Sequence, residues 1–233
     1  RADYYTDAID YTRLKILDSF EHSAPATAVV AHGEVHLVRR VPGFKKIRYY
    51  SHENVGFGNI DLPDLEMHST AVWWQLAEQV LDEEFAERQQ ALDGFLGLAY
   101  AMHHVAALHM MAEPRDLGRA VGDGEAGWFS SVDLTGRRKL HTLDAEQEMP
   151  GPRDRFRPAL FLYDNYPGGV GLSAPLYEQR ASLIEQTRQL ILRCECRHGC
   201  PACIGPILAS DGRTQTAPKL AAIRVAEIFS RAT

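Results

Sequence analysis

The sequence predicts an α+β protein with a small N-terminal antiparallel sheet, a helical core and a four-cysteine loop between two C-terminal helices. Three observations support this class. Polar and β-branched residues alternate over residues 26–50, residues 92–111 are mostly apolar as in a buried helix, and every cysteine lies within 194–203. We expect two units, a β-rich N-terminal subdomain over residues 1–60 and an α/β domain over residues 61–233.

The first half of the chain predicts strands followed by helices. Residues 26–50 predict two strands, ATAVVAHGEVHLVRRV and FKKIRYY, joined by a turn at VPGF. Residues 51–66 are rich in Gly and Pro and predict a loop or an edge strand. Ser69 or Thr70 could cap a helix that runs to about Gln90.

The middle of the chain contains the most apolar predicted helix, over residues 92–111, which we expect to be buried. Its His103, His104 and His109 are never four residues apart, so we expect core or interface histidines and not a metal site. Residues 113–127 contain several glycines and predict a loop.

The remaining elements lead to the cysteines. Residues 128–134 predict a strand, and residues 135–157 predict a long polar loop. ALFLYD (159–164) predicts a buried strand that ends in a sharp turn at NYPGG. Residues 172–193 and 219–231 predict helices on either side of the cysteine loop.

The charge of −6 disfavours indiscriminate nucleic-acid binding, but the basic residues are clustered. Residues 180–233 hold eight Lys or Arg against four Asp or Glu. A second cluster mixes basic and aromatic residues, as surfaces that bind single strands do, although a charged, solvated hairpin is an alternative. The candidate nucleic-acid contacts are Arg39, Arg40, Lys45, Lys46, Arg48, Tyr49, Arg193 and Arg197.

The cysteines follow the pattern C-x-C-x3-C-x2-C at Cys194, Cys196, Cys200 and Cys203. Four thiolates at such spacing bind zinc tetrahedrally, and a closed site of this kind is structural. We therefore expect one structural zinc ion per chain. An iron–sulfur cluster and disulfides remain alternatives, although no secretion signal is visible.

The turn PGGVGLS follows a predicted strand and opens a predicted helix. Gly168, Gly169 and Gly171 could contact a phosphate group there, or could serve only a tight turn that needs positive φ. We expect Asp164 to stabilise the turn, with a catalytic role in a nuclease as the alternative. The chain has neither a GxxxxGK[ST] loop nor a DExH box, so we assign no catalytic residue and expect no ATP hydrolysis by it alone.

LYDNYPGGVGLS, a helix and CECRHGCPACIGP follow one another in the order of a known family. This part of the chain resembles the C-terminal zinc-binding module, the MZB domain, of MrfA-like superfamily-two DNA helicases. DYYT, VPGFKKI, NVGFGNIDLP, MHSTAVWW and EPRDLG resemble further segments of that region. The resemblance covers most of the chain and is strongest over residues 160–206, whereas LASDGRTQTAPKL after Ile204 departs from the family pattern.

The resemblance implies a DNA-repair helicase whose ATP-binding, DEAD/DEAH-like motor lies outside this sequence and moves 3′-to-5′ on DNA. It also implies structural zinc on the four cysteines. The expected partners are single-stranded or forked DNA, through the parent helicase, and the motor domains. A zinc-stabilised protein-interaction module of a multi-protein system, such as a defence complex, is the alternative.

The N-terminal residues contain no apolar signal core and no initiator Met, and no apolar run is long enough to span a membrane. We therefore expect a cytoplasmic piece of a longer protein, without a membrane partner.

Overall fold

The computed structural model describes residues 3–23, 27–49, 54–125, 128–131, 157–205 and 217–232. Its strands are β1 (Tyr4–Ser23), β2 (Ala28–Arg48), β3 (Asn54–Asn59), β4 (Leu65–Leu76), β5 (Leu117–Glu125), β6 (Trp128–Ser131) and β7 (Pro158–Asp164). Its helices are α1 (Glu78–Glu84), α2 (Arg88–His109), α3 (Ser173–Glu178), α4 (Arg180–Arg193), α5 (Pro201–Ile204) and α6 (Pro218–Ser230).

Six of these strands close into an antiparallel barrel. The strands follow the order β1-β6-β5-β7-β4-β2, and β1 pairs with β2 as well as with β6, which closes the ring. β3 pairs with the C-terminal part of β2, over Gly43–Ile47, and is not part of the ring. Because side chains alternate along a strand, each strand sends one set of residues inward. All six contribute to one buried cluster, namely Leu14, Ala31, Val35, Leu37, Met67, Ala71, Trp73, Ala120, Phe129, Ala159, Phe161 and Tyr163.

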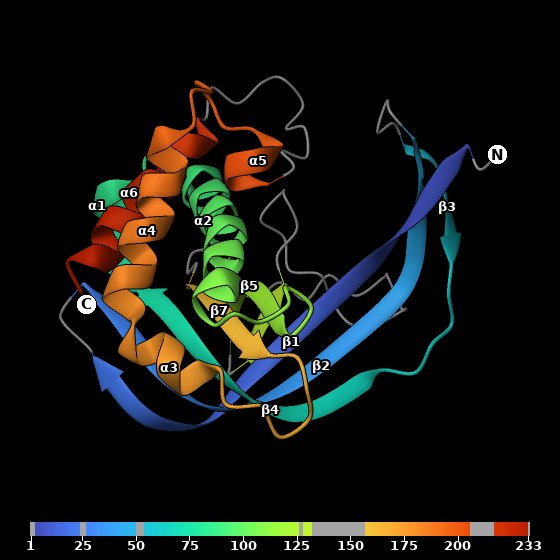
Figure 1. Ribbon diagram of the computed structural model, residues 1–233, viewed down its shortest axis with the longest axis horizontal. Helices are drawn as coiled ribbons and strands as arrows, with labels where there is room; N and C mark the ends of the chain where they lie inside the picture. The colour runs from blue at the N-terminus through green and yellow to red at the C-terminus, as the bar shows by residue number, and fades with distance from the viewer. Residues whose placement is uncertain are drawn as a thin grey trace.

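A second core lies between the barrel and the helices. Trp74, Leu160 and Leu162 point outward from β4 and β7 and pack in a cluster with residues of α2, α4 and α6. Helix α2 contacts β5 and β7 as well as α4 and α6, and it lies at the centre of the helical layer (Figure 1). The Phe95 and Phe229 rings join α2 to α6 edge to face, with their centroids 5.8 Å apart. This layer positions the cysteine loop, which follows α4 and contains α5.

The α+β class and most of the predicted elements are confirmed. The structure has a buried helix over 88–109, a wholly buried strand over 158–164 and a C-terminal helix over 218–230. The helix predicted over 172–193 is present but is divided into α3 and α4 at Gln179. An edge strand lies within 51–66.

The prediction of two strands with a turn at VPGF is wrong, because β2 continues through this sequence as one strand. Its partner β1 changes register between Ile9–Gly43 and Tyr11–Arg40. This irregularity lies beside Pro42, which has no N–H for the ladder, so the pair accommodates the proline without turning.

The helix predicted from Ser69 or Thr70 to Gln90 is wrong in its first part, and only α1 and the first residues of α2 are helical within this range. Residues 65–76 form β4, which pairs with β2 and β7. Trp73 faces the barrel interior and Trp74 faces the helices, so the apolar run is buried on both faces of a strand, a pattern that periodicity does not separate from a helix.

The predicted loop over 113–127 contains strand β5 instead. Gly118 lies opposite Tyr163 in the barrel, where an added Cβ would lie 2.0 Å from Cζ of that tyrosine. The glycines here provide room inside the barrel and are not signs of a loop. The long loop predicted over 135–157 falls outside the described residues, apart from residue 157.

The N-terminal strand β1 was not predicted beyond the resemblance of DYYT, and it pairs with β2 over most of its length. Strands from both sides of residue 60 therefore share one barrel, and the division into units 1–60 and 61–233 stays a prediction. None of the described helices is long and apolar enough to cross a bilayer.

Candidate metal centre and nucleic-acid surface

The four cysteines come together between α4 and α6. All four Sγ atoms lie within 4.8 Å of one another. The separations are 3.6 Å for Cys194–Cys200, 3.5 Å for Cys196–Cys203 and 3.7 Å for Cys200–Cys203. A tetrahedron with zinc–sulfur bonds of 2.3 Å has edges of about 3.8 Å. The cluster therefore fits a zinc ion held by four thiolates.

The backbone of the loop explains why these residues converge. Gly199 adopts a φ of 113°, and an added Cβ there would lie 2.1 Å from Cδ1 of Ile204, so the bend requires glycine. After the bend, the short helix α5 begins at Pro201. The N–H of Cys203 donates to the Cys200 carbonyl at 3.0 Å, which holds the second pair of thiols on one turn.

The protein surroundings shift the thiol pKa values apart. Backbone N–H groups of Cys203 and Ala202 lower the pKa of Cys200 to about 7. Burial raises the pKa of Cys203 to about 12 and also raises the pKa of Cys196. A metal ion that binds all four sulfurs must therefore displace the protons of these thiols, and the positive charge of the ion then balances the negative thiolates.

Three or more His, Cys, Asp or Glu residues can share a metal ion when their ligand atoms lie close together. Among the residues that the structure describes, the four cysteines form one such group and no other is found. Asp164 is fully buried and stands outside any such group. The described residues therefore place no group of three or more potential metal ligands around Asp164 that would support the nuclease alternative.

Asp164 instead organises the glycine turn. One carboxylate oxygen accepts the N–H groups of Val170, Gly171 and Leu172 at 2.7, 2.8 and 3.1 Å. The other two glycine amides of the turn are also used, since Gly168 donates to the His68 carbonyl and Gly169 to the Tyr166 carbonyl. Gly168, Gly169 and Gly171 have φ of 81°, 74° and 88°, as a tight turn requires. Phosphate contact at these amides stays a prediction that the hydrogen bonds do not favour.

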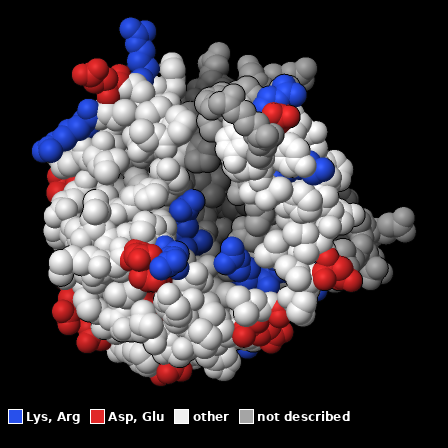
Figure 2. Space-filling view, turned by 45° about the vertical axis from the view of Figure 1, so that its right-hand side comes forward, with Lys and Arg blue, Asp and Glu red and all other residues white. Residues whose placement is uncertain are grey.

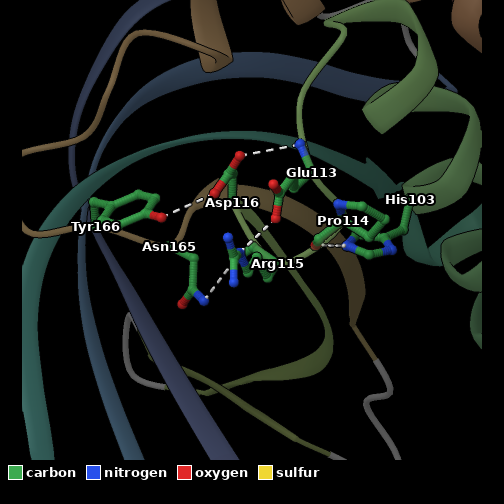
Figure 3. Close-up of polar contacts among 7 residues, drawn as sticks. All are labelled: His103, Glu113, Pro114, Arg115, Asp116, Asn165 and Tyr166. Atoms are coloured by element: carbon green, nitrogen blue, oxygen red, sulfur yellow. Dashed lines mark hydrogen bonds and ion pairs between the residues drawn. The ribbon is translucent and has the colours of Figure 1, made fainter.

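The glycine turn is joined to the loop at EPRDLG, which the sequence places 50 residues away (Figure 3). The Tyr166 hydroxyl donates to Asp116, and the Asn165 side chain donates to the Arg115 carbonyl, at 2.8 and 3.0 Å. On the other side of this loop, His103 lies within hydrogen-bond distance of the Pro114 and Leu117 carbonyls. His103 is thus a buried structural residue, and burial lowers its pKa.

The predicted nucleic-acid contacts lie in two places. Arg193 ends α4, beside the metal centre, and Arg197 lies within the cysteine loop. The remaining candidates, Arg39, Arg40, Lys45, Lys46, Arg48 and Tyr49, lie on β2 or just after it. Arg40 forms an ion pair with Asp64, with 2.6 Å between Nε and Oδ1, so its charge is partly offset.

The fold adds aromatic residues from β1 to the β2 cluster. Lys46 Nζ lies 5.5 Å from the ring centroid of Tyr4, and the Tyr5 and Tyr49 rings are 5.4 Å apart. Tyr4 and Tyr49 are nearly half exposed. Because neighbouring residues of a strand point to opposite faces, Tyr4 and Lys46 lie on one face of this β1–β2 end, and Tyr5, Lys45 and Tyr49 lie on the other. We call these five residues, on both faces, the strand-end surface. It combines exposed rings with basic groups, the combination that stacks bases and pairs with phosphates.

The space-filling view shows a hollowed face on which several Lys and Arg side chains gather around the depression (Figure 2). A further cation–aromatic group lies on the barrel where β1 meets β6. Arg13 and Lys15 lie over the Trp128 ring, 4.5 and 6.0 Å from its centroid. The sequence did not predict this group, because Trp128 meets β1 only through long-range strand pairing. The alternation of YTRLKI over residues 11–16 was the available signal.

Known proteins share sequence with much of this chain. Residues 98–204 match the family of the MrfA Zn-binding domain. Over 205 residues the chain is 30% identical to "Uncharacterized ATP-dependent helicase YprA" of Bacillus subtilis (strain 168), covering 87% of this chain and 23% of YprA. A 45-residue segment is 40% identical to an uncharacterized protein of Methanocaldococcus jannaschii, covering 19% of this chain and 40% of that protein.

Solved structures of a DUF1998 helicase, MrfA, also resemble this chain. The structure of the DUF1998 helicase MrfA bound to DNA superposes with a TM-score of 0.61 and 26% identity, over 99% of this chain and 26% of that chain. A further MrfA structure matches with a TM-score of 0.50 and 24% identity, over 85% of this chain and 23% of that chain, which supports the fold. The chain spans about a quarter of the length of the helicases it matches. Residues 98–204 thus match the MrfA Zn-binding domain, and the chain as a whole resembles the corresponding part of the DUF1998 helicase MrfA.

Proposed function

We propose that this chain is the non-motor C-terminal module of an ATP-dependent, superfamily-two DNA-repair helicase that moves 3′-to-5′. In this role it carries one structural zinc ion on Cys194, Cys196, Cys200 and Cys203, and it guides single-stranded DNA or braces the motor domains. The observation that carries the proposal is the superposition of nearly the whole chain on a DNA-bound MrfA-type helicase.

The zinc role is supported by the donor set. Four thiols at tetrahedral separations leave no position open for substrate, so the ion would fasten the loop between α4 and α6 and would not catalyse a reaction. Zinc binding and folding of the loop are coupled in such sites. Elemental analysis of the purified chain should give one zinc per chain, and a folded, metal-free preparation would overturn this part.

The DNA role is supported by the strand-end surface. Its tyrosines offer rings for base stacking, and Lys45 and Lys46 offer charges for phosphates, although the whole chain is acidic. We expect binding of a fluorescent single strand that weakens steeply as salt rises. We also expect no ATP turnover by the chain alone, because ATP binding belongs to the parent helicase. ATP hydrolysis by this chain would contradict the assignment.

A protein-interaction module remains a second candidate, and strand β3 favours it. β3 pairs with β2 on one side, and Phe57 on it is 75% exposed. An apolar residue on a strand at the edge of a sheet suits a protein partner, as does a net charge of −6. Absence of DNA binding at low salt would favour this candidate over DNA guidance.

A further inference from the structure

Lys219 is an unusual residue in this fold, because it is a lysine that is only 7% exposed. It lies in the first turn of α6 and contacts the cysteine loop. Its ammonium group donates to the carbonyl oxygens of Cys194 and Cys196, at 2.5 and 2.8 Å. Its backbone N–H donates to the His198 carbonyl at 3.0 Å. One residue of α6 thus makes three hydrogen bonds to the first half of the loop.

These bonds fix the part of the loop that lacks regular structure. Cys200 and Cys203 are held by the turn of α5, whereas Cys194 and Cys196 lie in extended or irregular backbone after α4. Two carbonyls directed at one ammonium group set the orientation of both peptide units of the C-x-C segment. The side chains of Cys194 and Cys196 are then directed toward the other two thiols.

The charge of Lys219 also needs an explanation. Burying an ammonium group is costly unless a negative charge or several hydrogen bonds compensate it. Among the described residues, no carboxylate forms an ion pair with Lys219, and its side-chain partners are neutral carbonyls. A zinc ion with four thiolates carries a net charge near −2. That charge would lie next to the ligand carbonyls that Lys219 holds.

We propose that Lys219 is a positioning residue of the metal centre, whose ammonium group holds Cys194 and Cys196 in ligand geometry and offsets the negative charge of the four-thiolate site. This inference rests on the zinc-binding role proposed above. Groups that orient metal ligands typically change metal affinity 10- to 100-fold when they are removed. A lysine that only braced α6 would instead change stability equally with and without metal.

The test compares zinc retention by the full chain and its variants. The rate of zinc transfer to a colorimetric chelator is measured for the wild type, Lys219→Met, Lys219→Gln and Lys219→Arg. Lys219→Met should lose zinc about 10- to 100-fold faster. Lys219→Gln, which keeps a donor but no charge, should lose zinc faster than wild type, and Lys219→Arg should restore most of the retention.

Arg224→Met is the matched control, because it removes a cation from the same helix that pairs with Glu84 and not with the cysteine loop. It should retain zinc as the wild type does. Thermal unfolding of zinc-loaded and metal-free protein provides the second readout. For the Lys219 variants, the loss of Tm should be larger in the zinc-loaded form.

The outcomes separate this inference from the proposed function. Zinc release by Lys219→Met at the wild-type rate, or equal losses of Tm with and without zinc, would overturn the positioning role while leaving the zinc site intact. A wild-type chain that binds no zinc would overturn the zinc site itself. If Lys219→Met fails to fold, the comparison of Lys219→Gln with Lys219→Arg decides the question by the same criterion.

Discussion

The hydroxyl group of Thr70 on β4 donates to the carboxylate of Asp164 at the end of β7, with 3.0 Å between the two oxygens. The same carboxylate oxygen accepts three N–H groups of the following turn, from Val170, Gly171 and Leu172. One buried side chain therefore ties two adjacent strands of the barrel to the start of α3. The turn that precedes α3, α4 and the cysteine loop depends on this anchor.

Replacing Asp164 with alanine should destabilise the protein by about 3 kcal/mol or more, because it leaves several buried donors without an acceptor. Asp164→Asn, which keeps one oxygen for the three amides, should cost less. Urea unfolding followed by circular dichroism measures both. Thr70→Val is the control that removes one donor, at a cost of about 1 kcal/mol. A stable Asp164→Ala protein would show that the carboxylate is not the anchor of the turn.

The local features of the site could be predicted from sequence. The four cysteines and the turn after ALFLYD depend on neighbouring residues, so spacing and composition reveal them. Asp164 was expected to stabilise its turn, and its hydrogen bonds agree.

The barrel could not be predicted, because its closure depends on pairing between distant segments. β4 looked like a helix, since strands that are buried on both faces lack a period of two. β5 looked like a loop because of its glycines, but Gly118 makes room for Tyr163 on β7, and Gly122 and Gly124 make room for Phe129 on β6. Lys219 was visible in the sequence only as one basic residue of a helix, and its contact with the cysteine loop requires α4 and α6 to lie together.

Zinc affinity should fall sharply as the pH falls. The pKa of Cys203 is raised to about 12 and that of Cys196 is raised above its usual value, so both thiols are protonated at pH 8 without metal. Zinc must release at least these two protons, and the apparent affinity then falls about 100-fold for each pH unit lost. Because the pKa of Cys200 is about 7, zinc must also displace a proton from this thiol below neutral pH, and the fall in affinity becomes steeper there.

Competition with a chelator of known zinc affinity, between pH 6 and 8, measures this slope. The protein should also lose zinc-dependent stability in the same range, because the proton-bound thiols cannot act as ligands. An affinity independent of pH would mean that the thiols are already ionised in the metal-free protein.

Lys46→Glu should weaken single-stranded DNA binding more than an equal change of charge elsewhere. Lys46 lies over the Tyr4 ring in the strand-end surface, whereas Arg231 is an exposed residue at the end of α6. Losing one phosphate contact should reduce the slope of log affinity against log salt by about 0.7. Arg231→Glu should leave that slope unchanged, and fluorescence anisotropy across a salt series measures both. Equal effects of the two changes would indicate only long-range attraction and no contact at Lys46.

Gly94→Ala should destabilise the protein even though alanine favours helices by about 1 kcal/mol over glycine. On α2, a Cβ at residue 94 would lie 2.8 Å from the carbonyl oxygen of Ala221 and 2.9 Å from a methyl group of Val225, both on α6. Such overpacking costs about 1–3 kcal/mol, so the net effect should be a loss of stability.

The control for Gly94→Ala is Gly97→Ala, one turn further along α2. Its added Cβ would lie 3.1 Å from Cβ of Ile204 and 3.3 Å from that of Ala222, which displacements of about a few tenths of an ångström in the neighbouring helices can relieve. Gly97→Ala should therefore be closer to neutral in urea unfolding. Because α6 carries Lys219, a displacement of α6 by Gly94→Ala should also speed zinc transfer to a chelator, whereas Gly97→Ala should alter it less. A Gly94→Ala protein that is more stable than the wild type and keeps its zinc would mean that α2 and α6 do not pack this closely.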